Sequence, residues 1–305
     1  MAERRLPRYP VYVPSKGRYD VALTAKFLIR DEVPFKLVVE PAEREEYEKR
    51  FGAERVLVLP NDGMRLVGAR NWIKDHATAE GHARHWQLDD NISGLWRWWR
   101  GRRLYCRAGI ALAVTEDFVD RYENVAIAGL NYVMFGVQKS APPFYLNVHV
   151  YSCTLISNAI PHRWRLVYND DTDICLQVLA DGWCTVLMNA FLAQKITTMV
   201  IKGGNTADLY QGDGRLKMAR ALERVWPGVV TTKRRFKRPQ HVIRDSWKRF
   251  DTPLKLKPGV DLSALPPVDE YGMKVTALTE IRSPALRRAV EEAEAEALLK
   301  QGRKS

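Results

Sequence analysis

Residues 85–91 read HWQLDDN, and this stretch decides how the first half of the chain folds. An apolar-rich run ends there in two neighbouring carboxylates, Asp89 and Asp90, followed by the amide of Asn91. Carboxylates are costly to bury, and adjacent like charges repel each other. The stretch therefore predicts a buried strand that ends at a crevice, with the acids beyond the sheet rather than in the core.

The segments before this strand alternate between short apolar runs and stretches with helical patterning. Strands are expected at residues 10–13, 35–40, 55–60 and 85–90, and helices at 21–32, 42–52 and 68–81. This rhythm predicts an α/β fold in which helices cover both faces of a parallel sheet. Ligands of such sheets bind beyond the carboxyl ends of the strands, which is where residues 89–91 fall.

The second half of the chain has a mixed pattern. Strands are expected at residues 125–132, 146–157 and 184–191, and helices at 171–182 and about 214–224. We therefore expect one α/β domain with a mixed sheet over residues 1–230. A basic and Pro-rich extension is expected at 231–280, and an Ala/Glu-rich, partly disordered helix at 281–305.

The composition is that of a folded, basic protein. The chain has 305 residues, and 46% of them are hydrophobic, which excludes a wholly disordered chain. The formal net charge of +12 favours a polyanionic partner such as nucleic acid. The four cysteines lack the spacing of a zinc site, so we expect reduced core thiols. We see no signal peptide or membrane span and expect a cytoplasmic protein.

A second acidic cluster lies at residues 168–176, which read YNDDTDICL. Asp170, Asp171 and Asp173 precede an apolar helical stripe, and helix capping would explain one or two of them. Three acids around one helix start repel one another, which indicates a cationic partner or a raised pKa. One of them could act as a general base toward an acceptor hydroxyl.

The first cluster has a different interpretation. The oxygens of residues 89–91 could hold Mg²⁺ or Mn²⁺, although a turn or helix cap is the ordinary alternative.

Basic side chains also follow the predicted strands. Ser15, Lys16 and Arg18 come after the first strand, and Arg70 with Asn71 opens the helix before the acidic strand. Arg and Lys near strand ends suit phosphate binding. A solvated loop and a charged helix surface are the ordinary alternatives.

Two further features are weaker candidates for contact with a donor or a metal. The glycine-rich turn KGGNT at 202–206 contains Lys202 and Asn205 and is either a loop over the site or an ordinary turn. His241 follows a basic stretch and could fold back toward a metal. The other histidines show no metal-binding signature, so core or surface positions are expected for them.

Two segments combine aromatic and basic side chains in the way of a nucleic-acid surface, where rings stack on bases and cations hold phosphates. The candidate DNA-binding residues are Trp96, Arg97, Trp98, Trp99, Arg100, Arg102, Arg103, Lys233, Arg234, Arg235, Lys237 and Arg238. The alternative is that the tryptophans pack into the core or a dimer interface.

Several motifs together resemble the opening of a GT-A glycosyltransferase. They are VYVPSKGR at 11–18, VVEP at 38–41, VLVLP at 56–60, G-x-RN-x-I-x-DHA at 68–77 and HWQLDDN at 85–91. NDDTDICLQVLADGW at 169–183 and GGNTADLY at 203–210 continue the likeness. More narrowly, residues 10–230 resemble the TET/JBP-associated glycosyltransferases of bacteriophages, by the order and spacing of these motifs.

The resemblance implies a GT-A fold, a nucleotide-sugar donor (most simply a UDP-sugar) and a divalent metal, Mn²⁺ or Mg²⁺. It implies that residues 89–91 replace the DxD motif, with Asp89 at the ribose and Asp90 with Asn91 at the metal. An amide oxygen binds a divalent cation more weakly than a carboxylate does, so Asn91 puts metal affinity and metal dependence in question. The donor would also contact Pro14, Ser15, Lys16, Arg18, Arg70 and Asn71.

The same resemblance implies that Asp170 and Asp171 fill the xED motif, with Asp171 as the base. The implied acceptor is the hydroxymethyl group of 5-hydroxymethylcytosine in DNA, in a phage-infected host cell. A base on the face opposite the leaving diphosphate would give inversion, whereas a base beside the donor would allow retention. Two other functions stay open from the residues alone. A nucleotidyltransferase would also use acidic clusters, and a non-catalytic DNA-binding protein would explain the charge.

Overall fold

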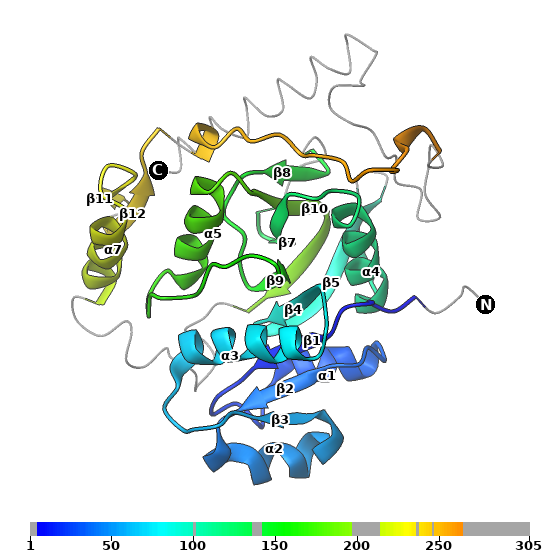
Figure 1. Cartoon of the computed structure of the whole chain (residues 1–305). Coiled ribbons are helices and arrows are strands. Elements are labelled where there is room, and N and C mark those ends of the chain that lie inside the picture. Colours follow the sequence, from blue (N-terminus) through cyan, green and yellow to red (C-terminus); the bar gives the residue numbers. More distant parts are fainter. Residues whose placement is uncertain are drawn as a thin grey trace.

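The computed structural model describes residues 5–99, 102–135, 142–196, 214–235, 238–245 and 247–264. Within them the chain forms a ten-stranded mixed sheet flanked by helices, together with a separate two-stranded hairpin (Figure 1). The main sheet has the order β3-β2-β1-β4-β9-β7-β10-β5-β6, and β8 pairs with β10. The predicted fold class, α/β with a mixed sheet flanked by helices, is confirmed.

The first half supplies the parallel part of the sheet. Its strands are β1 (Val11–Pro14), β2 (Lys36–Val39), β3 (Val56–Val58) and β4 (Arg84–Leu88). Its helices are α1 (Leu23–Arg30), α2 (Arg44–Phe51) and α3 (Arg65–Ala79). Strands β1, β2, β3 and β4 pair in parallel, as the alternating pattern predicts.

Both faces of this part of the sheet are buried. In β1, Val11 and Val13 face the cluster that contains Phe51 of α2, whereas Tyr12 between them faces Ile73 of α3. Burying one large aliphatic or aromatic side chain contributes about 1.5–3 kcal/mol. The alternation therefore fixes which helices cover which face, and it leaves the strand ends as the place for polar groups.

The second half is more irregular than its sequence suggests. Its strands are β5 (Ile92–Trp99), β6 (Arg102–Cys106), β7 (Val125–Tyr132), β8 (Phe144–Leu146), β9 (Cys153–Ser157) and β10 (Cys184–Lys195). Its helices are α4 (Ala108–Val119) and α5 (Asp170–Ala180). The sequence pattern predicted neither the β5–β6 hairpin nor α4. The single strand expected at 146–157 is wrong, because residues 147–152 separate β8 from β9.

Residues 147–152 leave the strand conformation because the backbone turns at both ends of the segment. Asn147 and Ser152 have φ values of 55° and 58°, in the left-handed region that few non-glycine residues adopt. The segment also passes close to β7 at Gly129, where an added Cβ would lie 2.5 Å from Cγ1 of Val150. This path brings His149 and Ser152 to the carboxyl edge of the sheet.

Beyond the main sheet, a helix and a hairpin pack against α5. They are α7 (Gly214–Val225), β11 (Val230–Arg235) and β12 (Arg238–Ile243). Leu222 of α7, Val230 of β11 and Leu176 of α5 form their shared core. Figure 1 shows α7 and the hairpin together beside α5. The domain boundary expected at residue 230 stays a prediction.

The chain then returns along the sheet as an extended segment. The side-chain amide of Asn147 donates to the carbonyl of Thr252 at 2.8 Å, and that of Asn124 donates to the carbonyl of Pro253 at 2.8 Å. The helix expected at 281–305 lies outside the described residues.

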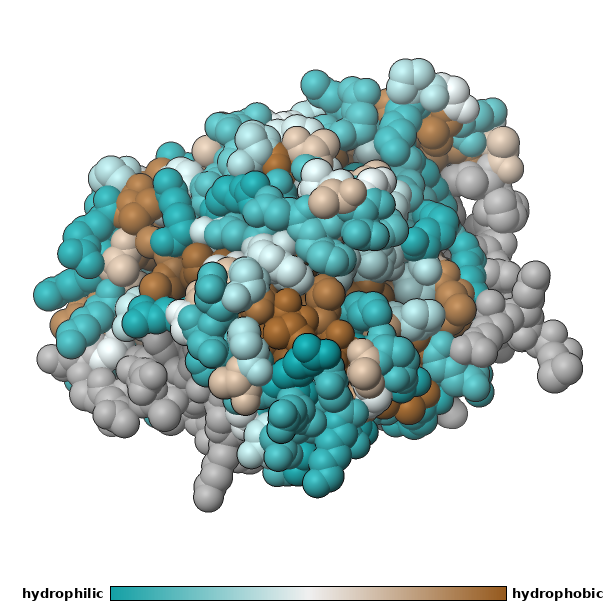
Figure 2. Space-filling view, turned by 60° about the horizontal axis from the view of Figure 1, so that its bottom comes forward, coloured by the Kyte–Doolittle hydropathy of each residue, from teal (hydrophilic) through white to brown (hydrophobic). Residues whose placement is uncertain are grey.

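Figure 2 shows a face that is hydrophilic over most of its area. In the described part of the chain no helix has the length and apolarity needed to span a membrane.

Candidate functional site

Three strands bring polar side chains to one edge of the sheet. Strands β1, β4 and β10 all run in the same direction. Strand β4 is parallel to β1, and β9 is antiparallel to both β4 and β7, so β7 runs in the direction of β4. Strand β10 is parallel to β7. The carboxyl ends of β1, β4 and β10 carry Ser15, Asp89 and Lys195, so residues far apart in sequence become neighbours. This is the edge at which α/β sheets bind ligands.

Asp89 receives three donors at this edge. Arg70 Nη2 lies 3.1 Å from Oδ1, while Lys195 Nζ and Ser152 Oγ each lie 2.7 Å from Oδ2. Burial alone would raise the pKa of Asp89, but the two cations hold it below its usual value. Asp89 is therefore a carboxylate at neutral pH, and its charge is matched by Lys195 and Arg70.

Arg70 connects the two acidic clusters. Its Nε lies 3.0 Å from Asp170 Oδ2, while its Nη2 contacts Asp89. The Arg70 side chain is only 6% exposed, so the carboxylates supply the compensation that a buried cation requires. Burial and the neighbouring acids Asp171 and Asp89 raise the pKa of Asp170 to about 6, against the opposing effect of Arg70. The clusters that follow β4 and open α5 thus meet around one guanidinium.

Asp171 lies beside this group and is more accessible than Asp170, with one third of its side chain exposed. Its Oδ2 lies 3.2 Å from Nε2 of His149, and its Oδ1 accepts the backbone N–H of Thr172 at 2.8 Å. Burial would raise the pKa of Asp171, but the imidazole of His149 and the hydrogen bonds outweigh it and lower that pKa. His149 in turn stacks on Trp247, with ring centroids 6.0 Å apart and an interplanar angle of 8°. Asp171 is thus an ionised carboxylate with a fixed histidine partner.

Asp173, the third acid of the cluster, has a structural environment. Its side chain is fully buried, and Arg165 donates to both of its oxygens. The indole Nε1 of Trp226, just beyond α7, donates to Oδ1 at 2.7 Å. Asp173 therefore anchors the end of α7 to α5 and does not face the other acids.

Asp90 points away from Asp89, into a pocket of its own. Ser15 Oγ donates to its Oδ2 at 2.7 Å, and Arg18 Nη1 forms a buried ion pair with its Oδ1. Burial raises the pKa of Asp90, although Arg18 and Ser15 oppose that effect. Tyr47 completes the cluster, with its hydroxyl 2.7 Å from Ser15 Oγ.

The expected metal ligands are Asp90 and Asn91. Both oxygens of Asp90 already have partners, and the amide nitrogen of Asn91 donates to the carbonyl of Ile196 at 3.3 Å. The buried Oδ1 of Asn91 has no donor in the described part of the structure. No group of three or more His, Cys, Asp or Glu side chains there could hold a metal ion. In this arrangement Asp90 and Asn91 do not fit a divalent cation, which needs several oxygen ligands with open lone pairs.

The other residues predicted to contact the nucleotide-sugar are either accessible at the edge of the sheet or held by hydrogen bonds to the protein. Pro14 ends β1, and Lys16 beyond it is about half exposed, with Nζ 2.7 Å from Glu40 Oε2. Asn71 is tied to a loop, since its Nδ2 donates to the carbonyl of Trp164 at 2.7 Å and its Oδ1 accepts the N–H of that residue at 3.0 Å. Lys202 and Asn205 lie outside the described residues.

The first Trp/Arg segment forms the edge hairpin β5–β6. Trp96 Nε1 donates to Gln194 Oε1 at 2.7 Å, and the Arg103 guanidinium lies 5.5 Å from the ring centre of half-buried Trp98. Arg97 is also half buried. Backbone alone is described for Trp99 and Arg102, and Arg100 lies outside the described residues. These tryptophans are partly packed on the sheet, and nucleic-acid contact stays a prediction for them.

The second basic segment forms the β11–β12 hairpin. Lys233, Arg234 and Arg238 are exposed. Arg235 is described by its backbone alone, and Lys237 lies outside the described residues. His241 of β12 is close enough to His149 and Asp171 for their charges to act on its pKa, which burial and His149 lower. The hairpin is therefore near enough to the acidic site for an electrostatic effect on His241. A role of His241 at a metal stays a prediction.

Three residues of the site escaped sequence reasoning. Lys195, Ser152 and His149 reach the acids through long-range packing, and each is an isolated polar residue in an apolar stretch of sequence. The positive φ of Ser152 is a structural sign of a functional position, since strained backbone gathers at such sites. Nothing in the local sequence announces that conformation.

Comparison with known proteins gives a family match. Residues 9–204 match the sequence model of the family described as TET-Associated Glycosyltransferase. No curated protein matches the chain.

Two solved structures resemble it at low similarity. One is described as a putative nucleotide-diphospho-sugar transferase from Desulfovibrio desulfuricans, with 10% identity, a TM-score of 0.36, and coverage of 60% of this chain and 80% of that one. The other is mannose-1-phosphate geranyltransferase from Thermus thermophilus, with 15% identity, a TM-score of 0.30, and coverage of 72% and 64%.

Proposed function

The chain belongs to the TET-associated glycosyltransferase family, and from this membership we propose that it moves a sugar from a UDP-sugar to 5-hydroxymethylcytosine in DNA. The acceptor atom is the oxygen of the hydroxymethyl group. The net charge of +12 supports a polyanionic acceptor.

One observation carries the proposal. Arg70 joins Asp89 and Asp170, so the carboxyl end of β4 and the first turn of α5 share one polar centre beside the more accessible Asp171. A transferase needs its donor-binding groups and its base within reach of one anomeric carbon. The two acidic clusters satisfy that requirement although 80 residues separate Asp90 from Asp170 in the sequence (170 − 90).

On the donor side, residues 14–18 and Asp89 line the edge of the sheet. Lys16 is the accessible cation there, and its Nζ can move from Glu40 to a phosphate oxygen. Asp89 takes the ribose and keeps Lys195 as its counter-ion. Arg18 and Arg70 are already paired with acids, so they act by holding Asp90, Asp89 and Asp170 in place.

On the acceptor side, Asp171 takes the proton. The hydroxymethyl oxygen attacks the anomeric carbon, its proton passes to Asp171 Oδ2 and the bond to the nucleoside diphosphate breaks. A base on the face opposite the leaving group gives inversion. His149 orients the carboxylate and keeps it ionised. A divalent cation, when bound, would add positive charge at the diphosphate. Because Asp90 and Asn91 do not fit one as they are arranged, no step is assigned to it.

The test is to incubate hydroxymethylated DNA with a panel of nucleotide sugars and to measure the masses of the resulting nucleosides by mass spectrometry. We expect a hexose or pentose increment, lowered about 10²–10⁴-fold in rate by Asp171→Asn. The matched control is Asp181→Asn at the other end of α5, where the carboxylate is 63% exposed and contacts His162. An increment equal to a nucleotide would indicate a nucleotidyltransferase, and an unmodified nucleoside with every donor would refute the proposal.

A further inference from the structure

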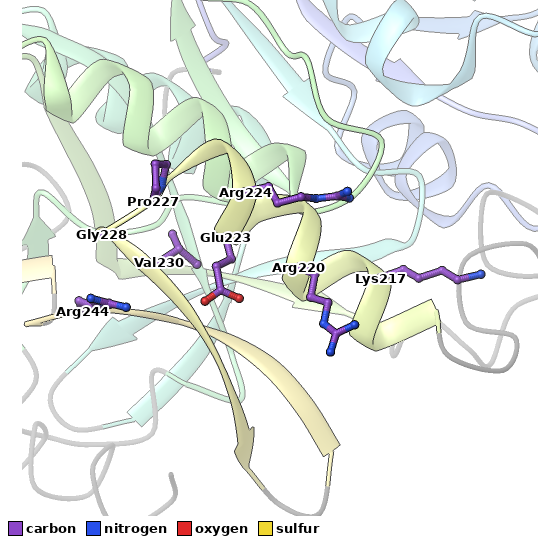
Figure 3. Close-up of a pocket in the computed structure, with 8 residues that line it drawn as sticks. All are labelled: Lys217, Arg220, Glu223, Arg224, Pro227, Gly228, Val230 and Arg244. Carbon is purple, nitrogen blue, oxygen red and sulfur yellow. The ribbon is translucent and has the colours of Figure 1, made fainter.

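A basic pocket lies between α7 and the β11–β12 hairpin, apart from the acidic site. Its volume is about 660 Å³. The lining residues are Lys217, Arg220, Glu223, Arg224, Pro227, Gly228, Val230 and Arg244. Figure 3 shows Lys217, Arg220 and Arg224 along α7, with Arg244 on the hairpin side. Four cations and one acid give this pocket a formal charge of +3 (4 − 1).

The cations of α7 form one exposed row. Lys217, Arg220 and Arg224 have the spacing i, i+3, i+7, which places them on one face of the helix. Within the described residues none of the three forms an ion pair with a carboxylate. Glu223 lies near Thr232 and Thr231 of β11 and near Arg244, and these groups lower its pKa. It is the single acid among the lining residues, so the row of three cations keeps a net positive charge.

The basic row is coupled directly to the acidic site. Asn169, the residue before Asp170, donates from Nδ2 to the carbonyl of Met218 at 2.9 Å. Met218 is the neighbour of Lys217, so the row begins next to the N-terminus of α5. On the hairpin, the charges of His149 and Asp171 act on the pKa of His241. A ligand along the row would therefore lead toward the candidate base.

We propose that the α7 row and the exposed hairpin cations bind the phosphodiester backbone of the acceptor DNA, so that the modified base reaches Asp171. This inference rests on the proposed function and adds the surface that presents the acceptor. Guanidinium groups match phosphate oxygens in two-pronged geometry, and a line of cations fits a repeating polyanion. The exposed hairpin residues Lys233, Arg234 and Arg238 extend the line.

A nucleic acid fits this surface better than an anionic membrane does. Membrane-surface helices combine cations with large apolar side chains that enter the bilayer. Among the described residues the exposed large hydrophobic side chains lie elsewhere, and none belongs to α7, β11 or β12. The surface therefore offers charge and hydrogen bonding without an apolar anchor.

The test uses the full chain and a fluorescent hydroxymethylated duplex, with the dissociation constant measured over a series of salt concentrations. We expect Arg220→Gln/Arg224→Gln to weaken binding about 10-fold or more near physiological salt. The slope of log affinity against log salt should fall by about 2, one for each lost phosphate contact. The matched control, Arg44→Gln/Lys49→Gln, removes two exposed cations from α2 and should keep the wild-type affinity and slope.

Further arms separate this inference from the proposed function. UDP affinity, measured by calorimetry, should be equal in wild type and Arg220→Gln/Arg224→Gln, and a loss would overturn the inference by making the pocket a donor site. Wild-type affinity and slope in that variant, with active glycosyl transfer to DNA, would refute the surface and leave the function standing. Loss of DNA binding in the variant, with no transfer by the wild type, would support the surface and refute the function. Vesicles of phosphatidylserine and phosphatidylcholine that bind more tightly than DNA, and depend on the same arginines, would also overturn the inference.

Discussion

Asp89 and Asp170 share the Arg70 guanidinium: Oδ1 of Asp89 lies 3.1 Å from Nη2, and Oδ2 of Asp170 lies 3.0 Å from Nε. One residue follows a strand and the other begins a helix, so this contact fixes β4 and α5 relative to each other. Asp171 takes its position from the same helix start. The buried cation is thus the centre from which the geometry of the site is set.

Removing this cation should unfold the site. Arg70→Leu leaves two acids without their shared counter-charge, and breaking a buried pair costs about 3–5 kcal/mol. We expect a loss of that size in the free energy of unfolding, measured in urea. Arg44→Leu breaks an exposed i,i+4 pair with Glu48 and should cost about 0.5 kcal/mol or less. Equal stabilities for the two variants would show that Arg70 is not the centre of the site.

The raised pKa of Asp170 predicts how stability depends on pH. The folded state holds this proton up to about pH 6, whereas the unfolded chain releases it near pH 4. Folding is therefore favoured below pH 4, and this contribution falls as the pH rises to 6. Asp170→Asn mimics the protonated form, so it should match the wild type at pH 4 and exceed it at pH 8 by up to about 3 kcal/mol. A variant that is less stable than the wild type at pH 8 would mean that Asp170 is stabilised as a carboxylate.

His149 should set the acidic limit of activity. A base works when it is deprotonated, and His149 lowers the pKa of Asp171 against the effect of burial. In His149→Ala the burial remains, so that pKa should rise. The acidic limb of the kcat/KM profile should then move to higher pH. His162→Ala, which removes the partner of Asp181 at the far end of α5, is the control and should keep the wild-type profile. An unmoved limb in His149→Ala would separate His149 from the base.

Metal removal tests the arrangement around Asp90. Because Ser15 and Arg18 occupy its oxygens, we expect UDP to raise the melting temperature equally in EDTA and in Mn²⁺. Stabilisation by UDP in Mn²⁺ alone would show that Asp90 leaves Arg18 and joins Asn91 on the cation. Arg18→Gln supplies the second readout. In that variant the carboxylate of Asp90 loses its ion pair, and the rise in melting temperature caused by UDP should become larger in Mn²⁺ than in EDTA.

The parallel half of the fold was predictable because local pattern and global structure agree there. Apolar runs separated by helical stretches specify β1 to β4 and α1 to α3, and strand direction alone then places Ser15 and Asp90 at one edge. The pattern also predicted a cationic partner or a raised pKa for the acids of α5, and the pKa of Asp170 is raised. Arg70, which the sequence suggested for phosphate, is that partner in the structure.

The remainder depends on contacts that no local pattern encodes. The run of Trp98 and its neighbours looked like a binding segment, but the strand alternation in it builds the β5–β6 edge. Lys195 meets Asp89 because β10 passes through the middle of the sheet, and His149 meets Asp171 because residues 147–152 leave the strand conformation. The first pairing joins residues more than a hundred positions apart, and the second depends on positive φ angles at Asn147 and Ser152. A local sequence pattern contains neither kind of information.

The family match ends at residue 204, whereas α7 and the hairpin begin at residue 214. That later part nevertheless contacts the start of α5, because the side-chain amide of Asn169 donates to the carbonyl of Met218 at 2.9 Å. Under the proposed function, we expect a chimaera that exchanges residues 214–245 between relatives to keep one parent's choice of sugar and to take the DNA affinity of the other.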